Sequence, residues 1–180
     1  MSIFRKAAAC VLTIAVMAPT VACGVQYDAI TLGQFEDAVE FIGLEYEAYA
    51  GELPPPGYYS FTEDEEHGAD ASYGLSLTGN HYAYMDFYDS SEGDKYFKSL
   101  YDEFEDQLKE ERFEGRCDYS YGTGSGYLLY NGVRDGMYTY GAMYYKDGIY
   151  VAAYTDSDKN KCINEINSFL GHLDFTKPDQ

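Results

Sequence analysis

Several residue types are scarce in this 180-residue chain, and the scarcities exclude classes of function. Tryptophan is absent, histidine occurs three times, and 12 lysines and arginines stand against 31 aspartates and glutamates. The net charge of −19 excludes nucleic acid as a partner, because binding to its backbone requires clustered cations. An anionic membrane surface would repel the chain for the same reason.

Motifs of catalysis and cofactor binding are also missing. The run Gly122–Gly126 reads GTGSG, but Thr123 and Tyr127 stand where a nucleophile elbow around Ser125 needs glycines. Tyr127 also replaces the third glycine of a dinucleotide fingerprint. No CxxC pattern accompanies the few histidines, so a zinc site is not expected. We therefore predict no cofactor, no metal ion and no catalytic residue of a known motif.

Long apolar runs are absent except near the N-terminus. Arg5 and Lys6 precede the apolar run Ala7–Met17, which is about half the roughly 20 residues that a membrane-spanning helix needs. A short positive segment followed by such a run is typical of a signal peptide. We expect residues 1–22 to be this signal and the mature chain to have no transmembrane helix.

The end of this segment resembles a bacterial lipobox of the Gram-positive type. Thr20-Val21-Ala22-Cys23 places small residues before a cysteine, and Gly24 follows it; Thr20 stands where the family usually has an aliphatic residue. The resemblance implies that diacylglycerol is attached to Cys23, that the chain is cut before it, and that the protein is held at the outer face of the cell membrane. The alternative is an ordinary secretory cut after Ala22.

The number of cysteines left in the mature chain agrees with lipidation of Cys23. Cys10 leaves with the signal, and acylation of Cys23 leaves Cys117 and Cys162, an even pair that in an exported chain predicts one disulfide. That bridge would close a loop of about 45 residues and contribute about 4 kcal/mol in the chain-entropy model. The alternative is two buried free thiols.

The mature chain has the size and apolar content of one domain. Hydrophobic residues make up 46% of the sequence, and a domain of this size buries roughly 70% of its unfolded surface. We expect a short tether over 23–30 and one globular domain over 31–176. Within it, residues 51–71 form an acidic, proline-containing loop that is functional or mobile, or contains a strand near Tyr58–Phe61.

Hydrophobic periodicity predicts an α+β fold. Helices are expected over 32–42, 92–111 and 158–170, with caps at Thr31, at Ser90 or Ser91, and at Ser157. Short strands and hairpin turns lie between them, the clearest turn being Asp147-Gly148. We predict a two-layer sandwich, in which an antiparallel sheet of five to six strands carries all three amphipathic helices on one face.

Tyrosine is the residue that most invites a functional interpretation. There are 21 tyrosines, and six of them alternate along two predicted strands: Tyr82, Tyr84, Tyr88, Tyr138, Tyr140 and Tyr144. If the helices cover one face of the sheet, these side chains line the other as a platform for a ligand. The alternative is that tyrosine simply suits a half-wet sheet surface.

These observations leave three hypotheses of function. The first is a lipid-anchored, non-enzymatic domain that binds a wall glycan or an envelope protein through its tyrosines. The second is a secreted hydrolase that uses a carboxylate pair, which leaves no sequence motif. The third is a structural subunit of an envelope complex.

Overall fold

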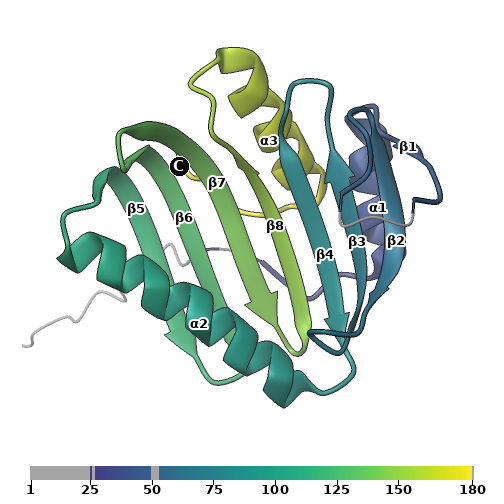
Figure 1. Cartoon of the computed structure of the whole chain (residues 1–180), viewed down its shortest axis with the longest axis horizontal. Helices are drawn as coiled ribbons and strands as arrows, with labels where there is room; N and C mark the ends of the chain where they lie inside the picture. Colours follow the sequence, from purple (N-terminus) through teal and green to yellow (C-terminus); the bar gives the residue numbers. More distant parts are fainter. Residues whose placement is uncertain (1–24, 26, 50–52, 180) are drawn as a thin grey trace, which may run out of the picture.

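The computed structural model describes residues 25, 27–49 and 53–179 of the chain. These residues form three helices and eight strands (Figure 1). In chain order the elements are α1 (Leu32–Phe41), β1 (Glu45–Tyr46), β2 (Tyr58–Asp64), β3 (Ala69–Leu75), β4 (His81–Phe87), α2 (Ser90–Lys109), β5 (Phe113–Gly122), β6 (Ser125–Arg134), β7 (Met137–Lys146), β8 (Ile149–Thr155) and α3 (Asn160–His172). The expected α+β class is therefore correct.

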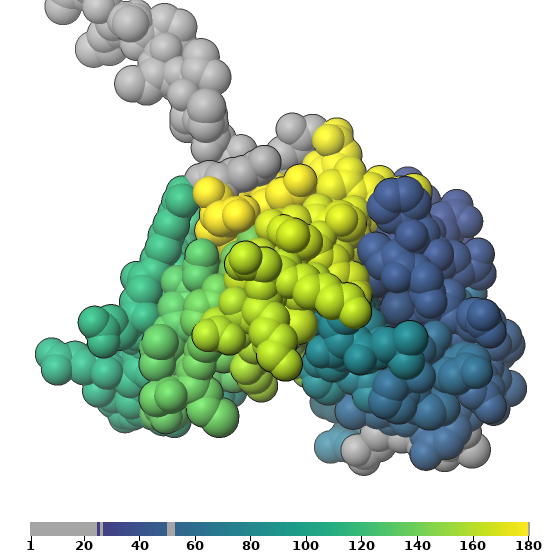
Figure 2. All heavy atoms as spheres, turned by 90° about the horizontal axis from the view of Figure 1, so that it is seen from above, coloured from purple at the N-terminus to yellow at the C-terminus, as the bar shows by residue number. Residues whose placement is uncertain are grey.

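All the described strands belong to one mixed sheet with the order β1-β2-β3-β4-β8-β7-β6-β5. Strands β2 to β4 form one antiparallel run and β5 to β8 another, each made of consecutive hairpins. The two runs join where β4 pairs antiparallel with β8, and β1 adds a short parallel edge to β2. Figure 2 looks down on the molecule and shows the C-terminal part of the chain between the green strands and the blue N-terminal half.

Both faces of the sheet are covered. Helix α2 crosses one face, and α1 and α3 pack on the opposite face (Figure 1). Phe97 and Phe104 of α2 enter one core cluster, whereas Phe35 of α1 and Phe169 of α3 enter the other. The molecule thus has three layers, with the sheet in the middle.

The expected two-layer sandwich, an antiparallel sheet of five to six strands with all three helices on one face, is wrong in the number of layers and of strands, and β1 makes the sheet mixed. Strand β8 explains the layers: its consecutive residues Val151, Ala152 and Ala153 are all buried, so neither face of the strand meets water. A strand buried on both faces needs helices on both sides. The alternative of a strand near Tyr58–Phe61 is correct, because residues 53–71 contain β2 and the beginning of β3, and this raises the number of strands.

Turn chemistry was predicted well where glycine follows aspartate. Asp147 (φ 53°) and Gly148 (φ 92°) form the tight β7–β8 turn, because a two-residue hairpin of this twist needs positive φ at both positions. The GTGSG segment differs from the expected flexible loop or bulge. Its outer residues Gly122 and Ser125 pair as the last rung of β5 and β6, which leaves a two-residue turn.

Helix caps were predicted correctly once in three cases. Thr31 accepts a hydrogen bond from the Gln34 backbone N–H, and the Gln34 side chain accepts from the Thr31 N–H, as a capping box requires. Helix α2 is capped by Asp89, one residue before the expected serines. Lys159, rather than Ser157, is the N-cap residue of α3 and makes no side-chain cap bond.

The expected tether over 23–30 is packed against the domain from Tyr27 onward. The Tyr27 ring lies 6.1 Å from the ring of Tyr127 and 5.2 Å from that of Tyr144, measured between centroids. Asp28 forms an ion pair with Lys146, and Ile30 is buried. These contacts fix the chain entry on the α1/α3 side of β6 and β7.

The expected Cys117–Cys162 disulfide is not formed, and both thiols are free. Cys117 lies on edge strand β5 and packs with the α2 cluster. Cys162 is buried on α3, on the opposite side of the sheet, where its thiol donates to the Thr78 carbonyl at 3.7 Å. The sheet therefore separates the two sulfurs, which spacing along the sequence does not reveal.

A half-buried cluster around the Glu165 carboxylate ties α3 to the β3–β4 turn. Glu165 accepts hydrogen bonds from the hydroxyl of Thr78 (3.1 Å), the amide of Asn80 (3.0 Å) and the hydroxyl of Tyr82 (2.9 Å). Hydrogen bonds to a charged acceptor are worth more than neutral ones, and removing it leaves buried donors unpaired.

We predict that Glu165→Ala lowers stability by about 2 kcal/mol. This corresponds to a fall in Tm of about 4–8 °C for a domain of this size, measured by calorimetry. The matched control is Asn164→Ala, at the exposed preceding position of the same helix. A fall of the same size in both variants would contradict the role of the Glu165 cluster.

We also predict that alkylation without reductant labels Cys117 and Cys162 as two separate peptides. Burial raises the pKa of the Cys117 thiol, so labelling is done after denaturation at alkaline pH. Cys117→Ser and Cys162→Ser should each lose one label. A two-hydrogen mass shift on reduction would contradict the separation of the thiols.

Candidate functional site

The tyrosines expected to form an open platform lie mainly in the core. Tyr82, Tyr84, Tyr140 and Tyr144 do share one face of the sheet, but this is the face that α1 and α3 cover, and each is at most 2% exposed. The expectation that they line an uncovered face is wrong, because the helices divide between the two faces.

The other two tyrosines behave differently. Tyr138 is half-buried at the edge of the same cluster, where its hydroxyl donates to Asn131 at 3.0 Å. Tyr88 follows β4 and is 66% exposed, and its hydroxyl donates to Asp70 at 2.8 Å. The six tyrosines therefore form no common surface.

The hydroxyls of the buried tyrosines fasten the α1/α3 layer to the sheet. Tyr140 donates to Asn167 of α3 at 2.7 Å, and Tyr144 donates to the carbonyl of Thr176 in the C-terminal segment. Burial raises the pKa of both tyrosines, so the hydroxyls stay protonated as donors. Their role is structural.

The opposite face of the sheet carries a small cleft of about 60 Å³ between α2 and strands β6 and β7. We call it the α2 cleft. It is lined by Leu100, Glu103, Phe104, Gln107, Leu128, Tyr130, Arg134 and Met143. The four helix residues follow an i, i+3, i+4, i+7 spacing, which places them on one side of α2. The cleft thus has apolar walls with an amide, a phenol and a guanidinium among them.

One of the residues that line this cleft carries a polar atom without a partner. The side chain of Gln107 is 5% exposed, and its Nε2 donates to Glu103 at 3.0 Å. Its Oε1 is buried with no hydrogen-bond partner within the described structure. A buried carbonyl oxygen without a donor costs free energy, so this atom favours a bound group that supplies an N–H or O–H.

Arg134 lies at the end of β6 and lines the same cleft, half-buried. No carboxylate among residues 25, 27–49 and 53–179 lies within 4.0 Å of its guanidinium, although the chain is strongly acidic. The neighbouring Asp135 is instead held by Arg112 through two bonds of 2.9 and 2.8 Å. Arg134 is therefore available to an anion.

A row of aromatic side chains continues from the cleft across the sheet. His81 on β4 stacks on Tyr154 of β8 with ring centroids 5.0 Å apart. Between Tyr154 and Tyr130 lies Gly141, where an added Cβ would meet the Tyr154 Cβ at 2.6 Å and the Tyr130 hydroxyl at 2.7 Å. Glycine at this position leaves room for the Tyr154 Cβ and for the hydroxyl of Tyr130.

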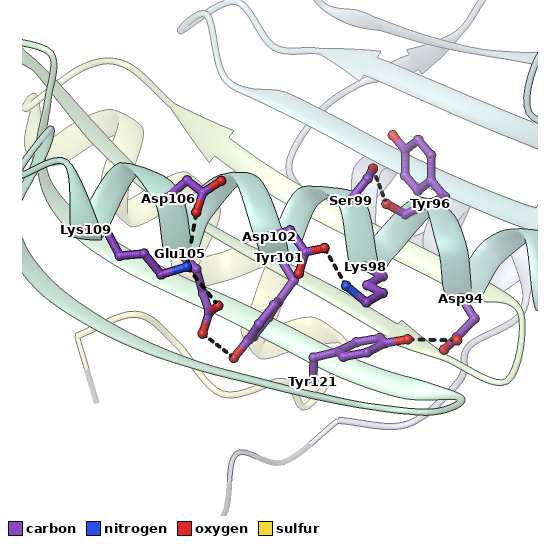
Figure 3. A network of polar contacts seen from close by, with 10 residues as sticks. All are labelled: Asp94, Tyr96, Lys98, Ser99, Tyr101, Asp102, Glu105, Asp106, Lys109 and Tyr121. Carbon is purple, nitrogen blue, oxygen red and sulfur yellow. Dashed lines mark hydrogen bonds and ion pairs between the residues drawn. The ribbon is translucent and has the colours of Figure 1, made fainter.

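Helix α2 also carries a network of charged and polar contacts outside the residues that line the cleft (Figure 3). Lys98 pairs with Asp102, and Lys109 pairs with Asp106 at 3.1 Å. At the start of the helix, Asp94 accepts from the Tyr121 hydroxyl and the Gly124 backbone N–H, both at 2.8 Å. The two Asp94 contacts hold the start of α2 to the end of β5 and the β5–β6 turn.

A wider groove of about 520 Å³ lies on the other side of the molecule, beside α3. The exposed Phe41 stacks on His172 there with centroids 4.6 Å apart, and Lys177 forms part of the wall. The groove is open to solvent, and among the described residues none of those that line it has a buried polar atom without a partner.

Three carboxylates lie in register on adjacent strands, Glu63 opposite Asp70 and Asp70 opposite Asp86. Burial and the charge of Asp70 raise the pKa of Asp86. The row lies on a strand surface, and Asp86 is exposed, so it does not have the enclosed geometry of a hydrolase acid–base pair. No three His, Cys, Asp or Glu side chains in the described ranges are placed to hold a metal ion.

Comparison with protein-family models, with curated proteins and with solved structures finds no match. Within the part of the chain that is described, none of the helices is long and apolar enough to cross a membrane.

Sequence reasoning missed both Gln107 and Arg134. A signal for Gln107 exists: it stands three residues after Phe104 on the buried stripe of α2, where a polar side chain needs a partner. Arg134 has no comparable signal, because its lack of a carboxylate neighbour follows from the pairing of β6 with β7 and not from the local sequence.

We predict that Asp86→Asn stabilises the protein at neutral pH. The folded-state pKa of Asp86 is raised, so the native state binds its proton more tightly and loses stability as pH rises through that pKa. Removing a like charge across two strands should contribute about 0.5 kcal/mol, or 1–2 °C in Tm, at pH 7. The gain should vanish in acid, once the Asp86 carboxyl of the unmodified protein is protonated.

The control for this measurement is Glu47→Gln, which removes the same unit of charge at an exposed position. It should change Tm by less than Asp86→Asn at pH 7. A gain from Asp86→Asn that persists or grows in acid would contradict the repulsion between Asp70 and Asp86.

Proposed function

We propose that this protein is a lipid-anchored extracytoplasmic lipoprotein whose single domain is a non-enzymatic binding module. The anchor is the diacylglycerol on Cys23, and the domain is held on the outer face of the cell membrane. The α2 cleft is its binding site, in place of the tyrosine surface. The observation that carries the proposal is the conjunction of an unpaired buried Gln107 oxygen and an unpaired Arg134 in one cleft.

The anchor is supported by the N-terminal sequence, which lies outside the described residues. A positive segment, a short apolar run and Thr20-Val21-Ala22-Cys23 occur there in the order of a lipoprotein signal. Because Cys117 and Cys162 are free, the cysteine count no longer bears on lipidation. The anchor is therefore supported by the sequence context of Cys23 alone.

Binding is favoured over hydrolysis by the chemistry of the cleft. It offers one acceptor, one guanidinium and one phenol, and a single carboxylate, Glu103, that is exposed and bonded to Gln107. Hydrolysis by a carboxylate pair needs two acids facing one bond, about 5–10 Å apart. Recognition needs only complementary polar groups on apolar walls.

We predict that the protein purified from bacterial membranes has the intact mass of a chain beginning at Cys23 and carrying diacylglycerol. It should partition into detergent, and Cys23→Ala should abolish both properties. Cys117→Ser is the matched control, which should keep the lipid. An unmodified mass beginning at Cys23 would contradict the anchor and make the protein a freely secreted one.

A further inference from the structure

We propose that the α2 cleft binds the C-terminal residue of a peptide, holding its carboxylate at Arg134, its backbone N–H at Gln107 Oε1 and its small side chain between the apolar walls. This rests on the proposed function, since it names the ligand class of the same site. The other surfaces offer less, because the groove beside α3 has no comparable pair of unmatched groups within the described residues.

The guanidinium of Arg134 selects the charge of the ligand. A planar guanidinium binds a carboxylate through two parallel hydrogen bonds, and no described carboxylate lies within 4.0 Å to take that place. The rest of the chain is strongly negative, which repels an extended polyanion but leaves a single carboxylate room beside a local cation. The cleft therefore suits one isolated carboxylate.

The Gln107 oxygen selects a donor next to that charge. Its Nε2 donates to Glu103, which leaves Oε1 as a buried acceptor without a partner. The last residue of a peptide carries an N–H and a carboxylate on the same Cα. A single residue thus supplies both groups that the cleft lacks.

The size of the cleft limits the side chain. Its volume of about 60 Å³ is less than half of the roughly 150 Å³ of a cavity that binds benzene, and its walls include Leu100, Phe104 and Met143. A methyl group fits such a space, whereas a sugar ring or an aromatic side chain requires the walls to open. Alanine is therefore the preferred terminal residue, with the preceding residues lying outside the cleft.

The test is calorimetric titration of the mature protein with N-acetyl-Ala-Ala and with its C-terminal amide. The free acid should bind about tenfold tighter than the amide, because one charge-assisted contact separates the two ligands. Arg134→Gln should remove that tenfold difference. Gln107→Met, which keeps the length and loses the acceptor, should weaken the acid about tenfold while Tm stays the same or rises.

The matched control is Arg116→Gln, which removes an exposed arginine of β5 outside the cleft and should leave binding unchanged. Equal binding of acid and amide, or full binding by Arg134→Gln, would overturn the inference. A parallel titration with glucuronate distinguishes a failure of the peptide assignment from a failure of the proposed binding function. Arg134-dependent binding of the sugar acid but not of the peptide overturns the peptide assignment and supports the binding module. If neither ligand binds, the peptide assignment is overturned.

Discussion

The pairing of β4 with β8 is the constraint on which the rest of the structure depends. Every other antiparallel contact of the sheet joins neighbouring strands of the chain, whereas this one joins residues as far apart as His81 and Tyr154. It converts two hairpin arrays into one sheet and creates the continuous face on which α3 can rest. Bringing two strands so far apart in the chain together costs loop entropy before their contacts can form. We therefore expect β2–β4 and β5–β8 to form first and to join afterwards.

That pairing also decides which surfaces exist. It places β8 in the centre of the sheet with both faces buried, so α2 and the α1/α3 pair must lie on opposite sides. The tyrosines of one face then become core residues with their hydroxyls bonded to helices. On the other face a single helix cannot cover the full width of the sheet, and the α2 cleft lies at its margin beside β6 and β7.

Features that depend on neighbouring residues could be predicted from the sequence, whereas the pairing of distant strands could not. The capping box at Thr31, the Asp147-Gly148 turn and the apolar stripe of α2 depend on residues within one turn or hairpin, and all three were predicted. The side of the sheet that each helix covers, the separation of the cysteines and the isolation of Arg134 depend on strand order. Alternation along a strand shows that residues share a face, but it does not say which face is covered.

The packing of Tyr27 onto Tyr127 and Tyr144 has a consequence for reach. If Cys23 carries the proposed lipid, at most about 14 Å of extended chain separates it from Tyr27. Because this tether is short and joins the domain on the α1/α3 side of the sheet, the domain has little freedom to rotate relative to the membrane. Repulsion between its acidic surface and anionic headgroups acts over about 10 Å and holds it just clear of the bilayer. The α2 cleft lies on the opposite face of the sheet and would then point away from the membrane.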